Sequence, residues 1–276
     1  MTDPGLYNQI LIWPITNIML ILYQMFYFLH LPYALGFAII AMTVIIRIIL
    51  YPLTNAQLKT SKRMQDLAPH IAKLKEAHKN DSKRLQTETM RLYKEHGVNP
   101  AAGCLPVLVQ FPFIIALYQS IFTLFNQDFG LTSINKILYS FVPPLDKMPD
   151  LNFFGYNLAH KPNEFSQYGP LLFLIPIITV ILSFIQSKMM PFPVKKYSSD
   201  SSKEKKEKQK SSDFASTMQT QMIYMMPLMI GFFSWQFPVG VSLYWNTFTV
   251  FGIIQQYKIS GLGSLEGIVN KIYVKK

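Results

Sequence analysis

The chain has 276 residues and a formal net charge of +11; half of its residues are hydrophobic and only 15% are charged. With a mean hydropathy of +0.21, this composition favours one membrane-embedded unit over soluble domains. The single cysteine, Cys104, excludes an internal disulfide framework and any zinc site built on cysteines. The positive charge is gathered into blocks without interleaved aromatic residues, which is typical of membrane topology signals and gives no reason to expect nucleic-acid recognition.

The N-terminal segment, residues 1–33, contains the apolar run Leu6–Leu31, which is long enough to cross a membrane. Its start, MTDPGLYNQ, has no basic region, so no ordinary cleaved signal is expected. The run is interrupted by Pro14, Thr16, Asn17, Gln24 and His30, and neither Lys nor Arg flanks it. Because such polar residues suit a surface helix, an interfacial amphipathic helix in the outer leaflet is predicted, with a further span as the alternative.

Five later stretches are apolar and close to the length of about 20 residues that a membrane-crossing helix needs. They are residues 34–58, 104–126, 168–188, 219–236 and 238–257. Lys and Arg are concentrated in the connections 59–98 and 189–218 and in the tail 258–276, whereas the connection 127–167 has more acidic than basic residues. Since positive charge marks the cytoplasmic side, the N-terminus is predicted outside and the C-terminus inside.

The two basic connections have different patterns. In 59–98, apolar residues recur at helical spacing on both sides of the turn Asn80-Asp81-Ser82, which predicts two antiparallel helices. The segment 189–218 contains a polar tract of low complexity, which predicts a disordered connection. The predicted fold class is therefore an all-α polytopic membrane protein, with a five-helix transmembrane bundle, an N-terminal interfacial helix and a cytoplasmic αα-hairpin.

Arg47 lies inside the apolar run MTVIIRIILY. On a continuous helix, the twelve residues from Arg47 to Lys59 would cover about 18 Å, which is too far for the side chain to reach the headgroups by snorkelling. A charge left in lipid costs about 2.5–3.5 kcal/mol. The five predicted spans contain no acidic residue, so we expect polar groups or water to come to Arg47.

Polar side chains on the predicted spans cluster towards the cytoplasmic side. Thr43, Arg47 and Tyr51 recur every four residues, as does Asn55, and would share one helix face. The last span carries a similar stripe. The candidate groove residues are Arg47, Thr43, Tyr51, Gln110, Gln186, Trp245, Asn246 and Thr249. They predict a wet recess that is open to the cytoplasm and closed to the outside, although a single Gln can equally be interfacial and a Thr can bond its own backbone.

The sequence contains no catalytic or metal-binding motif. Its five histidines show no metal-ligand spacing, and no glycine-rich phosphate loop or pair of intramembrane carboxylates is present. We therefore expect no enzyme activity, cofactor or metal. A small-solute channel or transporter is the alternative function, but polar residues towards the outer mouth and internal repeat symmetry, which it would need, are missing. A chaperone that folds already inserted helices also fits.

Three stretches, RIILYPLTNAQLKTSKRMQDLAPHIAKLKE, LYKEHGVNPAAGCLPVLVQFPFIIALYQSI and LYWNTFTVFGIIQQY, resemble the YidC/Oxa/Alb family of membrane protein insertases. The resemblance covers residues 6–260. It implies a protein whose groove, with Arg47, Gln186 and Trp245 at matching positions, receives nascent membrane proteins. The expected location is a bacterial plasma (inner) membrane, with the membrane of an organelle as the alternative. Implied partners are these substrates, the ribosome and the lipid bilayer, with the Sec translocon and signal recognition components as further candidates. The large extracytoplasmic domain, the lipoprotein cysteine and a long ribosome-binding tail of some relatives have no counterpart in this sequence.

Overall fold

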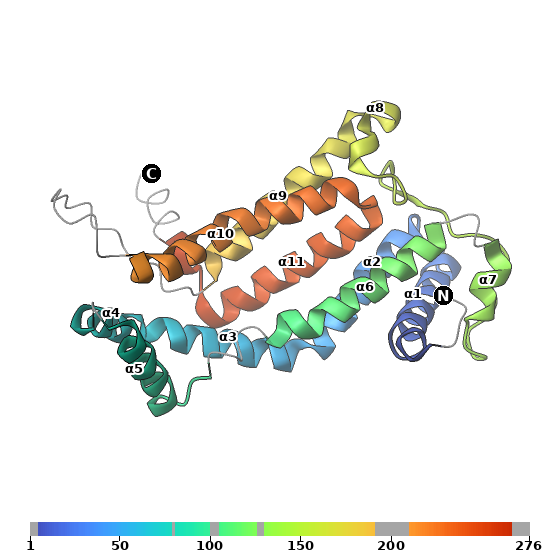
Figure 1. Cartoon of the computed structure of the whole chain (residues 1–276). Helices are drawn as coiled ribbons and strands as arrows, with labels where there is room; N and C mark the ends of the chain where they lie inside the picture. The colour runs from blue at the N-terminus through green and yellow to red at the C-terminus, as the bar shows by residue number, and fades with distance from the viewer. Residues whose placement is uncertain (1–4, 79–80, 100–104, 126–129, 191–209, 267–276) are drawn as a thin grey trace. The chain divides into compact units, whose positions relative to one another are not determined.

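The structure, a computed structural model, describes residues 5–78, 81–99, 105–125, 130–190 and 210–266. For residues 105–110, 210–222 and 264 it describes the backbone alone. Most of these residues are helical (Figure 1). The chain divides into two compact units. Unit 1 comprises residues 1–51, 107–183 and 229–252, and unit 2 comprises residues 52–106, 184–228 and 253–276.

The N-terminal half forms a series of helices. A π-helical turn at Asn8–Ile12 leads into α1 (Trp13–Phe28), which is followed by α2 (Ala34–Ile49), α3 (Tyr51–Asp66), α4 (Ala68–Ala77), α5 (Ser82–Glu95) and α6 (Leu105–Phe125). The C-terminal half contains α7 (Gly130–Lys136), the strands β1 (Asn152–Phe153) and β2 (Tyr156–Asn157), α8 (Phe165–Tyr168), α9 (Leu174–Met189), α10 (Lys210–Gln236) and α11 (Val239–Ser260). Short 3₁₀ turns precede α8 and α9 and follow α11.

Among the described residues, two helices are long and apolar enough to cross a membrane. They are Asn8–Phe28 and Pro170–Met189, and a third crossing is obtained if α2 and α3, which are bent at Leu50, count as one broken span. The coarse prediction of a helical membrane protein is thus supported, whereas five separate crossings remain a prediction. The polar residues that suggested a groove in α11, among them Asn246, Gln255 and Gln256, also lower the mean hydropathy of this helix. For this reason α11 is not among the helices that are apolar enough to cross.

Two predicted boundaries differ from the observed ones. The predicted span 34–58 is interrupted at Leu50, and a new helix starts with Tyr51 and Pro52. Proline lacks an amide hydrogen and fits the first turn of a helix better than its interior, which explains the break. The connection 189–218 was expected to be disordered throughout, but α10 already begins at Lys210. Residues 191–209 of that connection lie outside the described ranges.

Two of the polar residues that suggested an amphipathic surface helix, Thr16 and Asn17, face the protein, so their presence in this run has another explanation. Thr16 is fully buried, with Oγ1 2.8 Å from both the Ile12 carbonyl and Ser120 Oγ. Asn17 is buried as well, and its amide bonds to the backbone near residues 137–139, which follow α7. Large apolar side chains such as Ile10 and Ile18 are exposed instead. Whether α1 lies in the interface or crosses the membrane stays a prediction.

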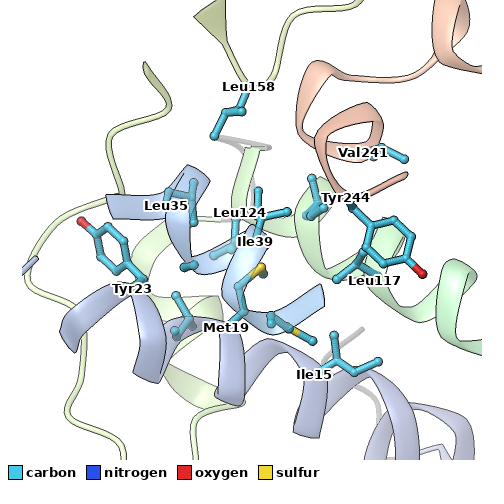
Figure 2. Close-up of a cluster of buried hydrophobic side chains, with 14 of the residues drawn as sticks. Ile15, Met19, Tyr23, Leu35, Ile39, Leu117, Leu124, Leu158, Val241 and Tyr244 are labelled. Atoms are coloured by element: carbon cyan, nitrogen blue, oxygen red, sulfur yellow. The ribbon is translucent and has the colours of Figure 1, made fainter. Parts of the chain in front are cut away.

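The hydrophobic core of unit 1 is shared by α1, α2, α6 and α11 (Figure 2). Met19 and Leu20 of α1, Leu35 of α2 and Leu117 of α6 are almost completely buried in it. Tyr244 contributes the aromatic side chain from α11. Each helix places an apolar stripe towards the others, and this common burial fixes the helices of unit 1 against one another.

The connection between α6 and α9 is packed onto unit 1 by backbone hydrogen bonds. The amide of Gly240 donates to the Leu158 carbonyl (2.8 Å), and the amide of Val239 donates to the His160 carbonyl (2.9 Å). At the start of α2, the ring of Phe153 lies directly over Gly36, where a Cβ atom would meet it at 1.9 Å. The connection therefore holds the first turns of α2 and α11 at the same end of the unit.

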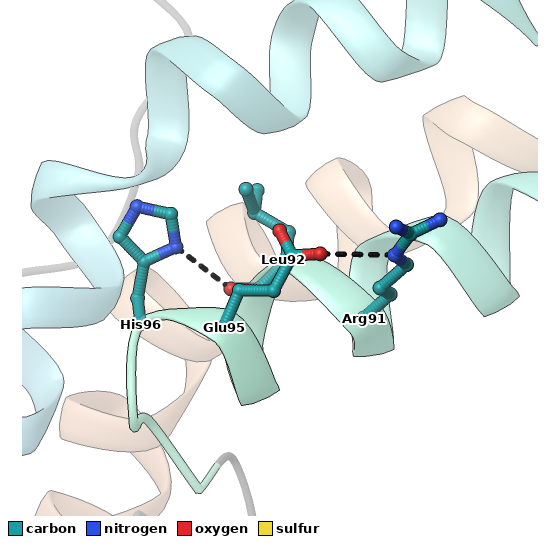
Figure 3. A network of polar contacts seen from close by, with 4 residues as sticks. All are labelled: Arg91, Leu92, Glu95 and His96. Atoms are coloured by element: carbon teal, nitrogen blue, oxygen red, sulfur yellow. Dashed lines mark hydrogen bonds and ion pairs between the residues drawn. The ribbon is translucent and has the colours of Figure 1, made fainter.

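In unit 2, α4 and α5 contact each other, with the rings of His70 and His96 6.4 Å apart. Asp81 caps α5 by accepting the Arg84 amide hydrogen (3.0 Å). Figure 3 shows the end of α5, where Arg91 Nε lies 2.9 Å from Glu95 Oε1 and His96 Nδ1 lies 2.9 Å from the Leu92 carbonyl. Both charged groups are exposed, so this ion pair contributes little to stability.

Candidate functional site around Arg47

Arg47 lies in the last turn of α2 and is only 4% exposed. It follows Thr43 by one helical turn, on the face of α2 that is buried in unit 1. Its Nη2 donates to the backbone carbonyl of Phe248 in α11. Its Cζ lies 3.3 Å from the centre of the Phe248 ring, and the Phe251 ring is centred 5.8 Å away. The guanidinium is therefore held against α11 by one hydrogen bond and by cation–π contact.

The charge of Arg47 has no carboxylate partner within the described part of the chain. The ion pair found there joins Arg91 to Glu95. Arg47 Nε is buried and has no hydrogen-bond partner among the described residues. The Phe248 ring and carbonyl carry no formal charge, so they do not neutralise Arg47. A guanidinium offers five N–H donors, and some of those of Arg47 therefore stay unused.

Three further candidate residues lie on α11, close to Phe248 in sequence. Thr249 is almost fully buried, and Trp245 is half-buried and packs against the hydrophobic core. The side-chain oxygen of Asn246 is buried without a hydrogen-bond partner in the described ranges. A buried amide oxygen without a partner is costly unless another group or water reaches it. The segment of α11 that contacts Arg47 is therefore polar. Its buried Asn246 oxygen lacks a hydrogen-bond partner among the described residues.

Among the remaining candidates, Tyr51 is the residue that departs from the helix face it was expected to share with Thr43 and Arg47. Thr43 is buried, and its hydroxyl donates to the Ile39 carbonyl of its own helix (2.6 Å). Tyr51 is 38% exposed and starts α3, so the break at Leu50 ends the continuous four-residue stripe. The side chain of Gln110 lies outside the described residues. Gln186 is half-buried on the part of α9 that belongs to unit 2, so its convergence with Arg47 stays a prediction.

Sequence reasoning missed the aromatic partners of Arg47 and a cluster of hydroxyl groups in unit 1. Phe248 and Phe251 are three residues apart and flank the polar stripe of α11, which was the available signal. In the cluster, Ser234 Oγ lies 3.2 Å from Thr179 Oγ1 and 2.9 Å from Ser242 Oγ. These contacts join α9, α10 and α11. No group of three His, Cys, Asp or Glu that could hold a metal ion occurs in the described ranges.

A helical chain with helices apolar and long enough to cross a membrane, and with a buried arginine that has no carboxylate partner among the described residues, is typical of a membrane protein that handles polar groups inside the bilayer. Residues 25–263 match the family model described as 60Kd inner membrane protein. The chain therefore belongs to this family, which comprises the YidC, Oxa and Alb proteins.

Relatives of this chain occur in bacteria and in chloroplasts. It is 34% identical over 229 residues to the membrane protein insertase YidC of Fusobacterium nucleatum, covering 83% of this chain and 87% of that protein. It is 31% identical over 246 residues to the inner membrane protein ALBINO3, chloroplastic, of Arabidopsis thaliana (85% and 48% covered). It is 32% identical over 228 residues to the YidC of Rickettsia massiliae (82% and 35%). The chain thus spans half or less of the length of the latter two.

The fold is similar to that of a solved insertase. The crystal structure described as an active YidC insertase with the first transmembrane domain resolved aligns with a TM-score of 0.56 at 22% identity. The alignment covers 92% of this chain and 47% of that one. This likeness supports the helical membrane fold as a whole.

Proposed function

We propose that this protein inserts nascent membrane proteins into a lipid bilayer, with Arg47 as a fixed cation that attracts the polar part of the substrate. Membership of the family supports the general activity. The observation that carries the role of Arg47 is its burial beside α11 without a carboxylate partner among the described residues. No nucleotide hydrolysis is required, because the partitioning of the substrate supplies the driving force.

Arg47 is suited to a transient electrostatic contact. The Phe248 ring and carbonyl position the guanidinium without neutralising it. In a low-dielectric environment an uncompensated charge attracts a carboxylate more strongly than it does in water. An acidic or polar segment of a substrate would bind the unused donors, including Nε. Polar groups nearby, such as Asn246, would help to keep water beside the segment.

Release follows from hydrophobic partitioning. Each Leu, Ile, Phe or Val at the centre of a substrate helix gains about 0.3–0.6 kcal/mol on entering the bilayer. Summed over a span of about 20 residues, this gain exceeds the transient cost of the polar segment. The substrate helix therefore moves into lipid while its short polar segment reaches the far side.

The proposal includes a cytoplasm-open groove in a five-span bundle, with a cytoplasmic hairpin formed by α4 and α5 and with the N-terminus outside. The ribosome is a proposed partner because substrates would arrive during synthesis, and the basic connection 59–98 lies on the predicted cytoplasmic side. The Sec translocon and signal recognition components are further proposed partners. The proposed location is the plasma membrane of a bacterium.

The test uses purified protein in vesicles and two substrates that differ only in an acidic or a neutral polar tail. Arg47→Ala is expected to abolish insertion of the acidic substrate and to affect the neutral one less. Arg47→Lys keeps the charge and is expected to retain most insertion. Protease protection of the translocated tail measures the outcome. Wild-type insertion of the acidic substrate by Arg47→Ala would refute the role of the charge.

A matched variant separates charge from packing. Phe248→Leu removes the ring that lies against Arg47 but keeps the backbone carbonyl and the charge. It is expected to insert the acidic substrate better than Arg47→Ala does. If Phe248→Leu and Arg47→Ala instead lose insertion of both substrates equally, Arg47 acts by clamping α2 to α11 rather than by attracting the substrate.

A further inference from the structure

One end of unit 1 exposes a group of large apolar side chains. Phe28 (81% exposed) is the last residue of α1, Leu29 and Leu31 lie in the turn between α1 and α2, and Phe154 (63% exposed) lies at the tip of the β1–β2 hairpin. The rings of Phe154 and Tyr33 are 4.8 Å apart, so the hairpin tip lies against this turn. We call Phe28, Leu29, Leu31, Tyr33 and Phe154 the turn patch.

The hairpin is fixed to the protein by one aromatic ring and presents the next one outward. Phe153 pairs with Tyr156 across the two strands, and its ring packs on Gly36 and 5.7 Å from the ring of Phe37. Phe153 is half-buried, while Phe154, the following residue, is mostly exposed. Phe153 is therefore the more buried anchor of the hairpin, whereas Phe154 contacts neighbouring rings and leaves most of its own ring exposed.

The backbone at the turn patch is strained. Within the described ranges, the non-glycine residues with positive φ are His30 (55°), Tyr33 (60°) and Phe154 (50°), and all three lie in or beside the patch. The left-handed region is unfavourable for residues with a Cβ atom, and tight hairpin turns prefer Gly or Asn there. The rings of Tyr33, Phe37 and Phe153 contact the Phe154 ring but leave it 63% exposed. An exposed phenylalanine at such a position is unfavourable in water for both reasons, so the uncovered part of the ring is suited to a partner outside the chain.

The neighbouring helices favour the lipid bilayer as this partner. The helix Asn8–Phe28, which is apolar and long enough to cross a membrane, ends at the patch. The patch would therefore lie at the membrane boundary whether that helix crosses the membrane or rests on its surface. The connection that carries the hairpin leads directly into the second apolar helix, Pro170–Met189. Lys147, also in this connection, places its ammonium 4.9 Å from the ring of Tyr27. Aromatic rings beside a lysine are typical of the headgroup region.

We propose that the β1–β2 hairpin inserts the Phe154 ring into the headgroup and upper acyl region of the leaflet that the connection 130–169 faces, with Lys147 directed at the lipid phosphates. This anchor would hold the connection, and with it the first turns of α2 and α11, at a fixed depth. The inference concerns membrane placement and does not depend on the insertase function.

The test places a single fluorescent residue at the hairpin tip of the full chain. In a background of Trp13→Phe, Trp235→Phe and Trp245→Phe, the variant Phe154→Trp keeps an aromatic ring at the tip. The protein is reconstituted in phosphatidylcholine and phosphatidylglycerol vesicles that contain lipids brominated either near the headgroup or near the chain end. Ile178→Trp in the same background is the control for depth, because Ile178 is an exposed residue of the apolar helix that includes α9.

The expected result for the Phe154→Trp protein is strong quenching of its fluorescence by the shallow bromines and weaker quenching by the deep ones. The Ile178→Trp protein should show the opposite order or no preference. Aqueous iodide should quench the Phe154→Trp protein only slightly. Strong quenching of that protein by iodide, together with insensitivity to both brominated lipids, would overturn the proposal. Insensitivity to iodide and bromine alike would also overturn it, since it would mean that protein covers the ring.

Discussion

Polar side chains in the apolar helices of unit 1 are accommodated in three different ways. The Thr43 hydroxyl donates to a carbonyl of its own helix, so its hydrogen is not available to another group. Asn17 bonds across to the backbone near residues 137–139 and so ties α1 to the connection after α6. Arg47 is held by a ring and a carbonyl and keeps its charge. Only the third arrangement leaves capacity for an external polar group.

A glycine supports the contact between α2 and the β1–β2 hairpin. A Cβ atom at Gly36 would lie 1.9 Å from Phe153 Cδ2, so Gly36→Ala must displace the ring of Phe153. Overpacking of this kind costs about 1–3 kcal/mol, and we expect the unfolding midpoint of the purified protein to fall accordingly. Gly5→Ala, with nothing within 4 Å of the added atom, is the matched control. An unchanged midpoint for Gly36→Ala would show that the hairpin does not pack there.

Among the elements, the hydroxyl contacts between α9, α10 and α11 are expected to stabilise unit 1. Ser234→Ala removes the contacts to Thr179 and Ser242. Hydrogen bonds between membrane helices contribute about 0.6 kcal/mol on average and up to about 1.7 kcal/mol, so a decrease in the free energy of unfolding in this range is expected.

Reversible unfolding in mixed micelles measures this decrease. Ser183→Ala is the control, because the buried hydroxyl of Ser183 has no partner among the described residues. If the two variants lose equal stability, the contacts made by Ser234 contribute nothing specific.

A contact in the connection between α6 and α9 is expected to respond to pH. His160 stacks on Tyr168 with ring centres 3.5 Å apart, and its carbonyl accepts the amide hydrogen of Val239. Burial lowers the pKa of His160 below its usual value of 6.5, although Glu164 acts in the opposite direction. Between the lowered pKa of the folded state and 6.5, the unfolded state therefore binds more protons than the folded state does. The stability that His160 contributes is complete above pH 6.5 and decreases as the pH falls from 6.5 towards the lowered pKa.

Hydrogen exchange at the amides of Val239 and Gly240 is expected to accelerate as the pH falls through this window, after correction for the intrinsic pH dependence. His160→Phe keeps a ring against Tyr168 but cannot titrate, so its corrected exchange should stay constant. Equal pH dependence in both proteins would assign the effect to another group.

For the whole molecule, the membrane topology depends on α1. An outside N-terminus requires α1 to remain in the interface, whereas a crossing would place the N-terminus in the cytoplasm. We expect a cysteine in an N-terminal tag, in a Cys104→Ser background, to react with a membrane-impermeant maleimide added from outside. Asp146→Cys should react in the same way, and Gln86→Cys should react only after permeabilisation.

The three labelling sites distinguish the two topologies. Protection of the tag cysteine while Asp146→Cys reacts would show that α1 crosses the membrane and that the interfacial prediction is wrong. Protection of Asp146→Cys while Gln86→Cys reacts would invert the whole topology.

The sequence by itself determined the membrane class and the family resemblance, and it singled out Arg47 as a candidate, because a charge in an apolar run is costly wherever the helix packs. It did not show that Phe248 would hold Arg47, or that the polar residues of α1 would bond Ser120 and the backbone near residue 137. Those contacts join residues that are 104 to 201 positions apart in the chain. Helical periodicity specifies which residues share a face, but the partner of that face is decided only when several helices pack together.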